Sequence, residues 1–104
     1  MKKFDIIGME AHGHDQREKN VFHKSRGFKM RVIHLAPGES IPECRMATHV
    51  VLVCMEGDAE VGAGDERITL SRGQGLVTEP TVMTMKSETG ARLLGIQIAE
   101  GAGV

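Results

Sequence analysis

The chain has 104 residues, with 13 lysines and arginines against 14 aspartates and glutamates and a formal net charge of -1 at pH 7. This length fills the core of one domain, and the balanced charge excludes the basic surface that nucleic acids or anionic membranes attract. No apolar stretch approaches the roughly 20 residues of a membrane-spanning helix, and charged residues interrupt the start of the chain, where a signal peptide is apolar. Two cysteines are too few for a disulfide framework. We therefore expect a cytoplasmic protein with free thiols, which binds neither nucleic acid nor membrane.

The first 27 residues differ in character from the rest of the chain. Residues 4–7 and 21–24 each have the composition of a short strand. The polar stretch between them, residues 11–20, is expected to be a loop or a mobile arm. It contains His12-Gly13-His14-Asp15, which has the composition of a metal clip but is more simply explained as solvated. We expect residues 1–27 to be an arm with strands that pack on the main domain.

From residue 28 onward the sequence is a series of short β-rich segments separated by glycine or proline. The predicted strands are residues 28–35, 48–55, 59–61, 67–70, 75–78, 82–86 and 91–98. The apolar run within 48–55 is typical of a strand that is buried on both faces. This succession predicts an all-β sandwich or barrel over residues 28–98, followed by a disordered tail over residues 99–104.

Two stretches that begin and end with glycine carry a resemblance to a known family. Gly38 and Gly57 enclose a segment with the spacing of the first cupin motif, in which two histidines and a glutamate lie between two glycines. The second cupin motif has a partial counterpart that begins at Gly73, and Pro80 lies one place beyond the expected proline. Over residues 30–98 the chain thus resembles a small single-domain cupin. The resemblance implies a double-stranded β-helix, also described as a jelly-roll barrel.

The positions that hold the catalytic metal in this family carry other residues here. The resemblance implies three imidazoles and one carboxylate, which suit Fe(II), Mn(II), Ni(II) or Zn(II). The matching positions hold Cys44, Met46, Val50 and Thr84. Valine cannot bind a metal, and threonine is a poor neutral ligand. The metal-binding motifs are therefore degenerate, and no dioxygenase, isomerase or oxalate-degrading activity follows from the resemblance. We expect no cofactor, with a transition metal as the alternative.

The sequence leaves three interpretations of the barrel interior. The first is a pocket that takes a small apolar ligand or is packed by its own side chains, lined by Cys44, Met46, Val50, Leu52, Cys54, Val82 and Thr84. The second is a site for a soft metal such as Cu(I) or Zn(II), because Cys44 and Met46 would share one face of a strand; further sulfur ligands would be Cys54, Met83 or Met85. The third is a reactive thiol at Cys44 with a histidine base, His34 or His49.

His49 and four charged residues complete the candidate positions. Regular alternation turns His49 away from the pocket, but a local bulge would bring it inward and give an atypical metal site of Cys44, Met46 and His49. The charged residues are expected at the surface, with the first of them near the barrel mouth: Glu79, Glu88, Arg45 and Arg92.

The apolar run from Val50 to Met55 also bears on partners. One barrel interior covers only one face of this run, so the other face needs a second sheet, the N-terminal strands or another subunit. We expect a homodimer. The favoured function is a cupin-type barrel that is non-catalytic or binds a small ligand, and the alternative is a metal-dependent enzyme with an atypical Cys/Met/His site. A purely structural homodimer is a third hypothesis.

Overall fold

The computed structural model describes residues 1–99, which contain one short 3-10 helix and eight strands. In chain order they are η1 (His14–Asn20), β1 (Val21–Lys24), β2 (Phe28–Leu35), β3 (Ser40–Arg45), β4 (His49–Ala63), β5 (Glu66–Ser71), β6 (Gly75–Thr78), β7 (Val82–Lys86) and β8 (Ala91–Ile98). The all-β prediction is confirmed, and β1, β2, β6, β7 and β8 have the bounds that the sequence predicted. The helix of this described region is too short and too polar to cross a membrane.

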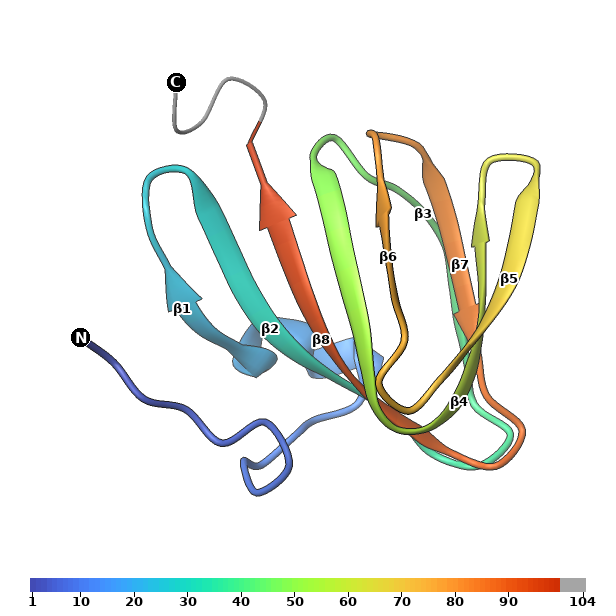
Figure 1. Cartoon of the computed structure of the whole chain (residues 1–104), viewed down its shortest axis with the longest axis horizontal. Helices are drawn as coiled ribbons and strands as arrows, with labels where there is room; N and C mark the ends of the chain where they lie inside the picture. Colours follow the sequence, from blue (N-terminus) through green and yellow to red (C-terminus); the bar gives the residue numbers. More distant parts are fainter. Residues whose placement is uncertain (100–104) are drawn as a thin grey trace.

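The strands form one antiparallel sheet that curls into two facing layers (Figure 1). One layer contains β1, β2, β8, the first half of β4 and β6, and the other contains β3, β7, the second half of β4 and β5. The long strand β4 belongs to both layers, because residues 49–57 pair with β8 whereas residues 58–63 pair with β5 and, over residues 60–63, with β7.

The strand β4 turns from one layer to the other at Gly57. Its φ of 73° lies in the left-handed region, and a Cβ at this position would lie 2.0 Å from the backbone oxygen of Gly90. Only glycine tolerates both conditions. A β-bulge between Cys54 and Glu56 adds to the bend. The second glycine of the cupin-like spacing therefore marks the corner at which the barrel closes.

Two strand predictions differ from the structure. Residues 48–55 and 59–61 belong to one strand, β4, because the chain turns at Gly57 without leaving the hydrogen-bond ladder. The strand β3 was not predicted. It contains Pro42, which has no N–H to donate, and its register against β7 shifts between Ile41 and Cys44. These irregularities remove the alternation by which a strand is recognised in a sequence.

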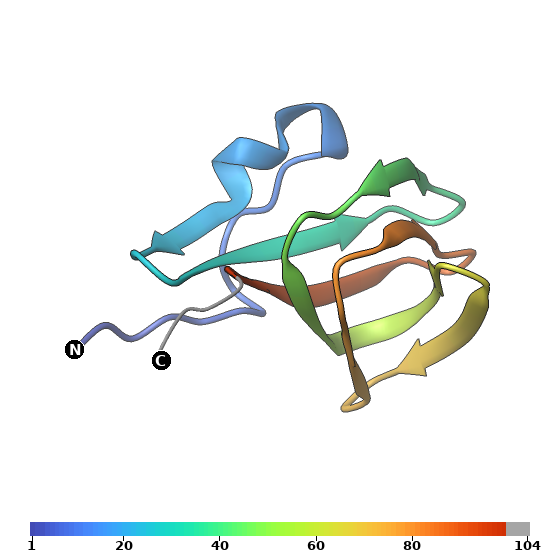
Figure 2. The same ribbon diagram turned by 90° about the horizontal axis from the view of Figure 1, so that it is seen from above.

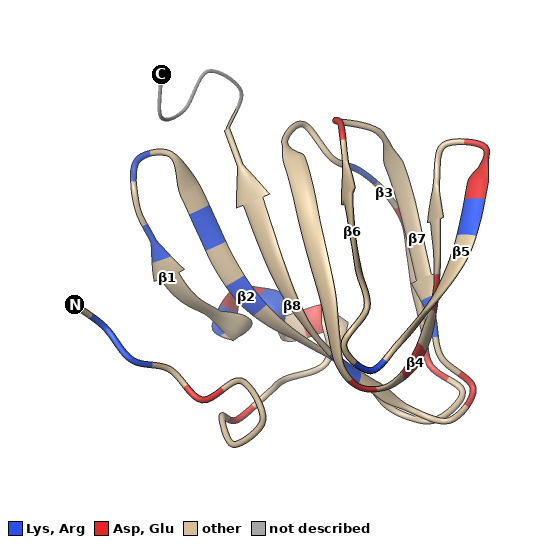
Figure 3. Ribbon diagram, viewed as in Figure 1, with Lys and Arg blue, Asp and Glu red and all other residues tan. Residues whose placement is uncertain are grey.

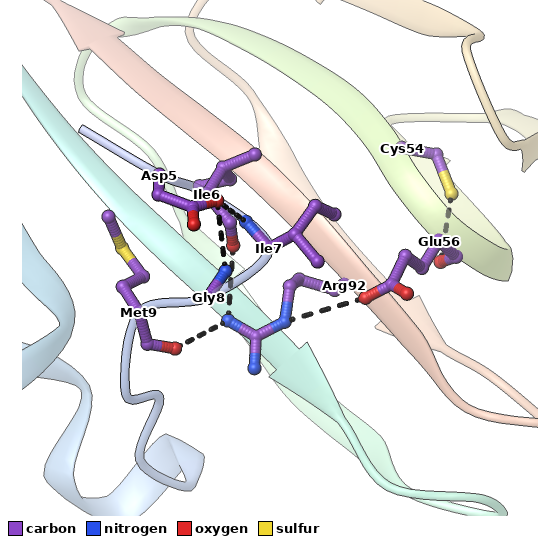
Figure 4. A network of polar contacts seen from close by, with 8 residues as sticks. All are labelled: Asp5, Ile6, Ile7, Gly8, Met9, Cys54, Glu56 and Arg92. Atoms are coloured by element: carbon purple, nitrogen blue, oxygen red, sulfur yellow. Dashed lines mark hydrogen bonds and ion pairs between the residues drawn. The ribbon is translucent and has the colours of Figure 1, made fainter. Parts of the chain in front are cut away.

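The N-terminal region also differs from its prediction. Residues 4–7 form no strand, because Asp5 closes a turn: its carboxylate accepts hydrogen bonds from the backbone N–H groups of Ile7 and Gly8, at 3.1 and 3.0 Å (Figure 4). Residues 14–20, expected as a loop, form η1. The predicted tail lies outside the described residues except for its first member, Ala99.

The core fills one end of the barrel, which we call the closed end. It contains the corner at Gly57 and the fully buried side chains of Leu35, Cys54, Val61 and Leu93. At the opposite end of β2, β8 and β4 the side chains do not meet, and a cavity remains. We call this the open end. The helix η1 lies beside β2, on the side where β3 lies (Figure 2).

Candidate functional site

A cavity of about 350 Å³ occupies the open end of the barrel. Its volume falls within the range of small-molecule sites in proteins. The base of the cavity is apolar, because β4 and β7 each direct alternate side chains into the barrel. The buried members of this base are Val50, Leu52, Met83 and Met85, and half-buried Ile33, Ile41 and Met46 pack around them.

Most of the residues predicted for the pocket lie on this cavity. The structure brings together Cys44, Met46, Val50, Leu52 and Thr84 on the lining. Cys54 and Val82 lie outside it. Cys54 belongs to the packed core of the closed end, and Val82 alternates with Met83, which points inward in its place.

The two cysteines have opposite environments. The Sγ of Cys54 is completely buried and lies 3.4 and 3.3 Å from the carbonyl oxygens of Glu56 and Gly57, to which the thiol donates. Burial raises the pKa of the Cys54 thiol, and the nearby carboxylate of Asp58 raises this pKa further. Cys54 is therefore a protonated, unreactive core residue. Cys44 is exposed and lies on the cavity rim.

One side of the cavity is covered by η1 and the residues before it. Asn20 is 5% exposed and holds this segment in place with two hydrogen bonds. Its Oδ1 accepts from the backbone N–H of His12 at 2.7 Å, and its Nδ2 donates to the carbonyl of His12 at 2.8 Å. His12 and His14 consequently lie on the cavity lining. Sequence reasoning missed Asn20, because a single asparagine in a polar stretch has no pattern that distinguishes a buried clamp from a solvated side chain.

Positive charge dominates the cavity rim. Among the described residues, four basic side chains line the cavity, Arg17, Lys29, Arg31 and Arg45, against one carboxylate, Glu18. The chain as a whole has one more acidic than basic residue, so this excess is local. Figure 3 shows the basic residues of β2 beside the uncharged upper parts of β8 and β4. The expectation that Arg45 lies at the surface agrees with its exposure, and its position places it on the rim.

Arg31 projects from β2 into the open end, and its side chain is 15% exposed. Its Nη2 donates to Gln97 Oε1 at 3.2 Å and lies 4.0 Å from Glu18 Oε1, on a side chain that is itself 77% exposed. Within residues 1–99 its Nε has no hydrogen-bond partner although it is buried, and the same holds for the hydroxyl of Thr48. Burial lowers the pKa of Arg31, and Glu18 offsets part of this effect.

Gly95 lies opposite Arg31 at the cavity. The two residues are cross-strand partners on β8 and β2. A Cβ at Gly95 would lie 3.0 Å from Ile33 Cδ1, whereas its distance of 3.5 Å from both Arg31 Cγ and Leu52 Cδ2 is an ordinary van der Waals contact. The absence of a side chain at this position therefore leaves room mainly for Ile33.

The residues at the cupin metal positions do not supply the three imidazoles and one carboxylate of the cupin metal site. Within residues 1–99, no three His, Cys, Asp or Glu side chains are grouped closely enough to hold one. Val50 offers no donor, and the hydroxyl of Thr84 lies against its cross-strand partner Gly62. His49 precedes Val50 on β4 and lies off the cavity lining. Three other histidines do line the cavity, but they form no such group: His12, His14 and His34.

The thiol of Cys44 has no histidine partner among the described hydrogen bonds. Its Sγ lies 4.0 Å from the carbonyl oxygen of Arg45. Of the two bases considered from the sequence, His34 lines the same cavity and His49 does not. A thiol–imidazole pair at Cys44 stays a prediction, as does the soft-metal site.

Comparison with solved structures identifies the fold. The crystal structure of an RmlC-like cupin protein from Desulfovibrio desulfuricans is 24% identical in sequence and superposes with a TM-score of 0.77, covering 94% of this chain and 96% of that one. An uncharacterized conserved protein with a double-stranded β-helix domain from Klebsiella pneumoniae superposes with a TM-score of 0.82 at 16% identity, covering 99% and 94%. A cupin superfamily protein from Desulfitobacterium hafniense superposes with a TM-score of 0.73 at 17% sequence identity. The match covers 88% of this chain and 84% of that protein.

These similarities confirm the predicted cupin-type double-stranded β-helix. No family model matches the sequence, and no curated protein matches it. At these identities the likeness shows the fold alone. The function of the barrel is therefore inferred from its own cavity.

Proposed function

We propose that this small cupin-type barrel is a non-catalytic binding module that takes a small organic ligand into the cavity at its open end. One observation carries the proposal, a cavity of about 350 Å³ whose base is lined by methionine and aliphatic side chains. Apolar pockets of this size with a few polar groups at the mouth are typical of small-molecule sites. Methionines adapt their shape to a bound molecule at little cost. A sensor, a carrier or an accessory subunit would each use such a site.

The cavity favours this function over a purely structural one. A barrel that serves only to hold its own shape is expected to be packed throughout, as it is at the closed end. The open end instead has ligand-sized space next to buried side chains.

Calorimetric titration with toluene, octanol and octanoate tests the proposal. We expect at least one of the three to bind with one site per chain and to raise the melting temperature. Val50→Phe, which fills the base of the cavity, should abolish the effect. Val77→Phe is the matched control, because Val77 is 74% exposed on β6 and lies off the cavity. If none of the three probes binds to the wild-type protein, the proposed function is wrong.

Elemental analysis of protein purified without chelators tests the enzyme alternative. We expect transition metal well below one per chain, with or without prior incubation with Fe(II), Zn(II), Ni(II) and Cu(I). About one metal per chain that is lost in Cys44→Ser or His49→Ala would overturn the binding-module proposal in favour of a metal-dependent enzyme.

We also propose a homodimer in the cytoplasm. The outward side chains of β4 and β8 form a half-exposed apolar row of cross-strand pairs, Val51 with Ile96 and Val53 with Leu94. Such a row suits a second copy of the chain. Light scattering of the wild type and of Val53→Lys tests the assembly, and a monomeric wild type would contradict it.

The free, exposed thiol of Cys44 supports the proposed location in the cytoplasm, because it suits a reducing compartment.

A further inference from the structure

Two residues on the cavity lining each have a buried polar atom without a hydrogen bond in the described part of the chain. The atoms are Arg31 Nε and the hydroxyl oxygen of Thr48. A buried donor without a partner costs about 1–3 kcal/mol, so folded proteins rarely keep one without a reason. Both atoms are closed to solvent, so a ligand in the cavity meets the accessible part of the Arg31 side chain, which is 15% exposed. The chain satisfies this guanidinium poorly, and its accessible part can take a partner from outside the chain.

The charge of the cavity indicates which kind of partner fits. Glu18 is the one carboxylate on the lining within residues 1–99, and it is a weak counter-charge for Arg31, at 4.0 Å and 77% exposed. Three further basic side chains line the same cavity: Arg17, Lys29 and Arg45. A guanidinium that is removed from water needs a paired negative charge, and the lowered pKa of Arg31 reflects the same deficit. An anion at Arg31 supplies both a hydrogen-bond acceptor and the negative charge that the guanidinium lacks.

The geometry of the Arg31 side chain favours a carboxylate as this anion. The planar guanidinium presents its N–H donors in a fork that matches the two oxygens of a carboxylate. Gln97 accepts one N–H of Nη2, and the guanidinium has further N–H groups for an incoming oxygen.

The rest of the cavity excludes a purely polar ligand. Behind the basic rim lie Leu52, Met83 and Met85, all buried, and none of them offers a strong hydrogen bond. A ligand that satisfies the rim and the base together has an acid group at one end and an apolar body at the other.

We propose that the ligand of this cavity is an amphipathic organic acid, whose carboxylate pairs with the guanidinium of Arg31 and whose apolar body lies against the methionines of β7. This inference rests on the proposed function and specifies the class of ligand.

A series of three probes with one chain length tests the inference. Octanoate, octanol and octylamine differ in the charge of the head group and share the apolar body. We expect octanoate to bind about tenfold to a hundredfold more tightly than octanol, because hydrogen bonds to charged groups contribute that much. Octylamine should bind more weakly than octanol, because the rim repels it. The preference for octanoate should decrease as salt concentration rises.

Two variants separate Arg31 from general charge effects. Arg31→Met keeps the apolar stem and should remove the preference for octanoate over octanol. Arg72→Met removes one exposed positive charge that lies off the cavity, and it should leave the affinities for both probes unchanged. If Arg31→Met does not fold, the comparison of the three probes on the wild-type protein still decides the question.

Alkylation of Cys44 checks where the probe binds. Cys44 is exposed on the rim and should react with a maleimide, whereas buried Cys54 serves as an internal control. Octanoate should slow the reaction of Cys44 in proportion to occupancy.

The outcomes distinguish this inference from the proposed function. If octanol binds as tightly as octanoate, or if bound octanoate leaves Cys44 unprotected, the inference is overturned while a binding module for other ligands stands. If octanoate, octanol and toluene all fail to bind, both proposals fall.

Discussion

Two arginines on neighbouring strands are equally buried and have opposite surroundings. Arg92 on β8 has a side-chain exposure of 16% and lies at the closed end, whereas Arg31 on β2 has 15% and lies at the open end. Arg92 Nη1 donates to the carbonyl oxygens of Ile6 and Met9, at 3.2 and 2.9 Å, and its Nε lies 3.9 Å from Glu56 (Figure 4). Within the described residues, Arg31 has one hydrogen bond and a distant carboxylate.

The difference separates a cation that the chain itself satisfies from one that it leaves poorly satisfied, to which we assign a ligand. Arg92 fastens the N-terminal turn to the outer face of the sheet, and the turn closed by Asp5 presents the carbonyls that it needs. Burial alone therefore does not identify a functional arginine. The informative quantity is the number of its donors that the chain itself satisfies.

The largest expected effect comes from the corner at the closed end. Gly57→Ala should destabilise the protein by at least about 3 kcal/mol, because the new methyl group would overlap the backbone oxygen of Gly90 and β4 would keep a left-handed φ. Gly73→Ala is the control, since Gly73 also has a positive φ, 84°, but a methyl group there would meet nothing within 4 Å. Gly73→Ala should lower the unfolding free energy by about 1–2 kcal/mol. Equal losses in urea unfolding would show that strain, and not the close approach, is what requires Gly57.

Replacing each arginine by methionine tests the comparison directly. Arg92→Met should cost about 2 kcal/mol of unfolding free energy, because it leaves the carbonyls of Ile6 and Met9 without their donor. Arg31→Met should change the unfolding free energy by less than about 1 kcal/mol or stabilise the protein, because the substitution removes a poorly compensated charge. Denaturant unfolding measures both. A loss at Arg31 as large as that at Arg92 would mean that both are structural.

Asn20→Ala tests whether Asn20 holds the N-terminal segment in place at the open end. Removing both hydrogen bonds to His12 should cost about 1–2 kcal/mol and increase amide exchange in residues 12–20 without affecting the closed end. Gln74→Ala is the matched control, because Gln74 accepts one hydrogen bond from the Ser71 N–H in an exposed turn. It should change stability by less than about 0.5 kcal/mol. Unchanged exchange in residues 12–20 would contradict the role of Asn20 as a clamp.

The smallest effect concerns pH and the buried thiol. The pKa of Cys54 is raised above its ordinary value of 9.0, so the folded state holds this proton more tightly than the unfolded state. Its contribution to stability is complete below that value and is lost as the pH rises above it, by at most about 1.4 kcal/mol per pH unit. Cys54→Ala should flatten this alkaline loss, and Cys44→Ala should not. Unfolding free energies between about pH 8 and pH 10 measure it; equal slopes in the wild type and Cys54→Ala would exclude Cys54 as the cause.

Much of the barrel could be predicted because its signals are local. The bounds of β2 and β8 follow from β-rich segments between turn residues, and the spacing from Gly38 to Gly57 predicted the cupin-type fold. The cupin-like spacing placed Val50 at the position of the family's glutamate and so in the pocket together with Leu52, and both line the cavity. The same rule failed at β3, where Pro42 and a register shift interrupt the alternation.

The sequence by itself determined the all-β class and the cupin-type fold, because both depend on residue type and spacing along the chain. Only the tertiary structure decided that Asn20 clamps the N-terminal arm beside the cavity and that Arg92 is satisfied while Arg31 is not. From the sequence, Arg92 was expected at the surface and residues 11–20 were expected to be a solvated loop. The physical reason is that the partners of Arg92 are 83 and 86 residues away along the chain, and a hydrogen bond over such a separation leaves no periodic signal in the sequence.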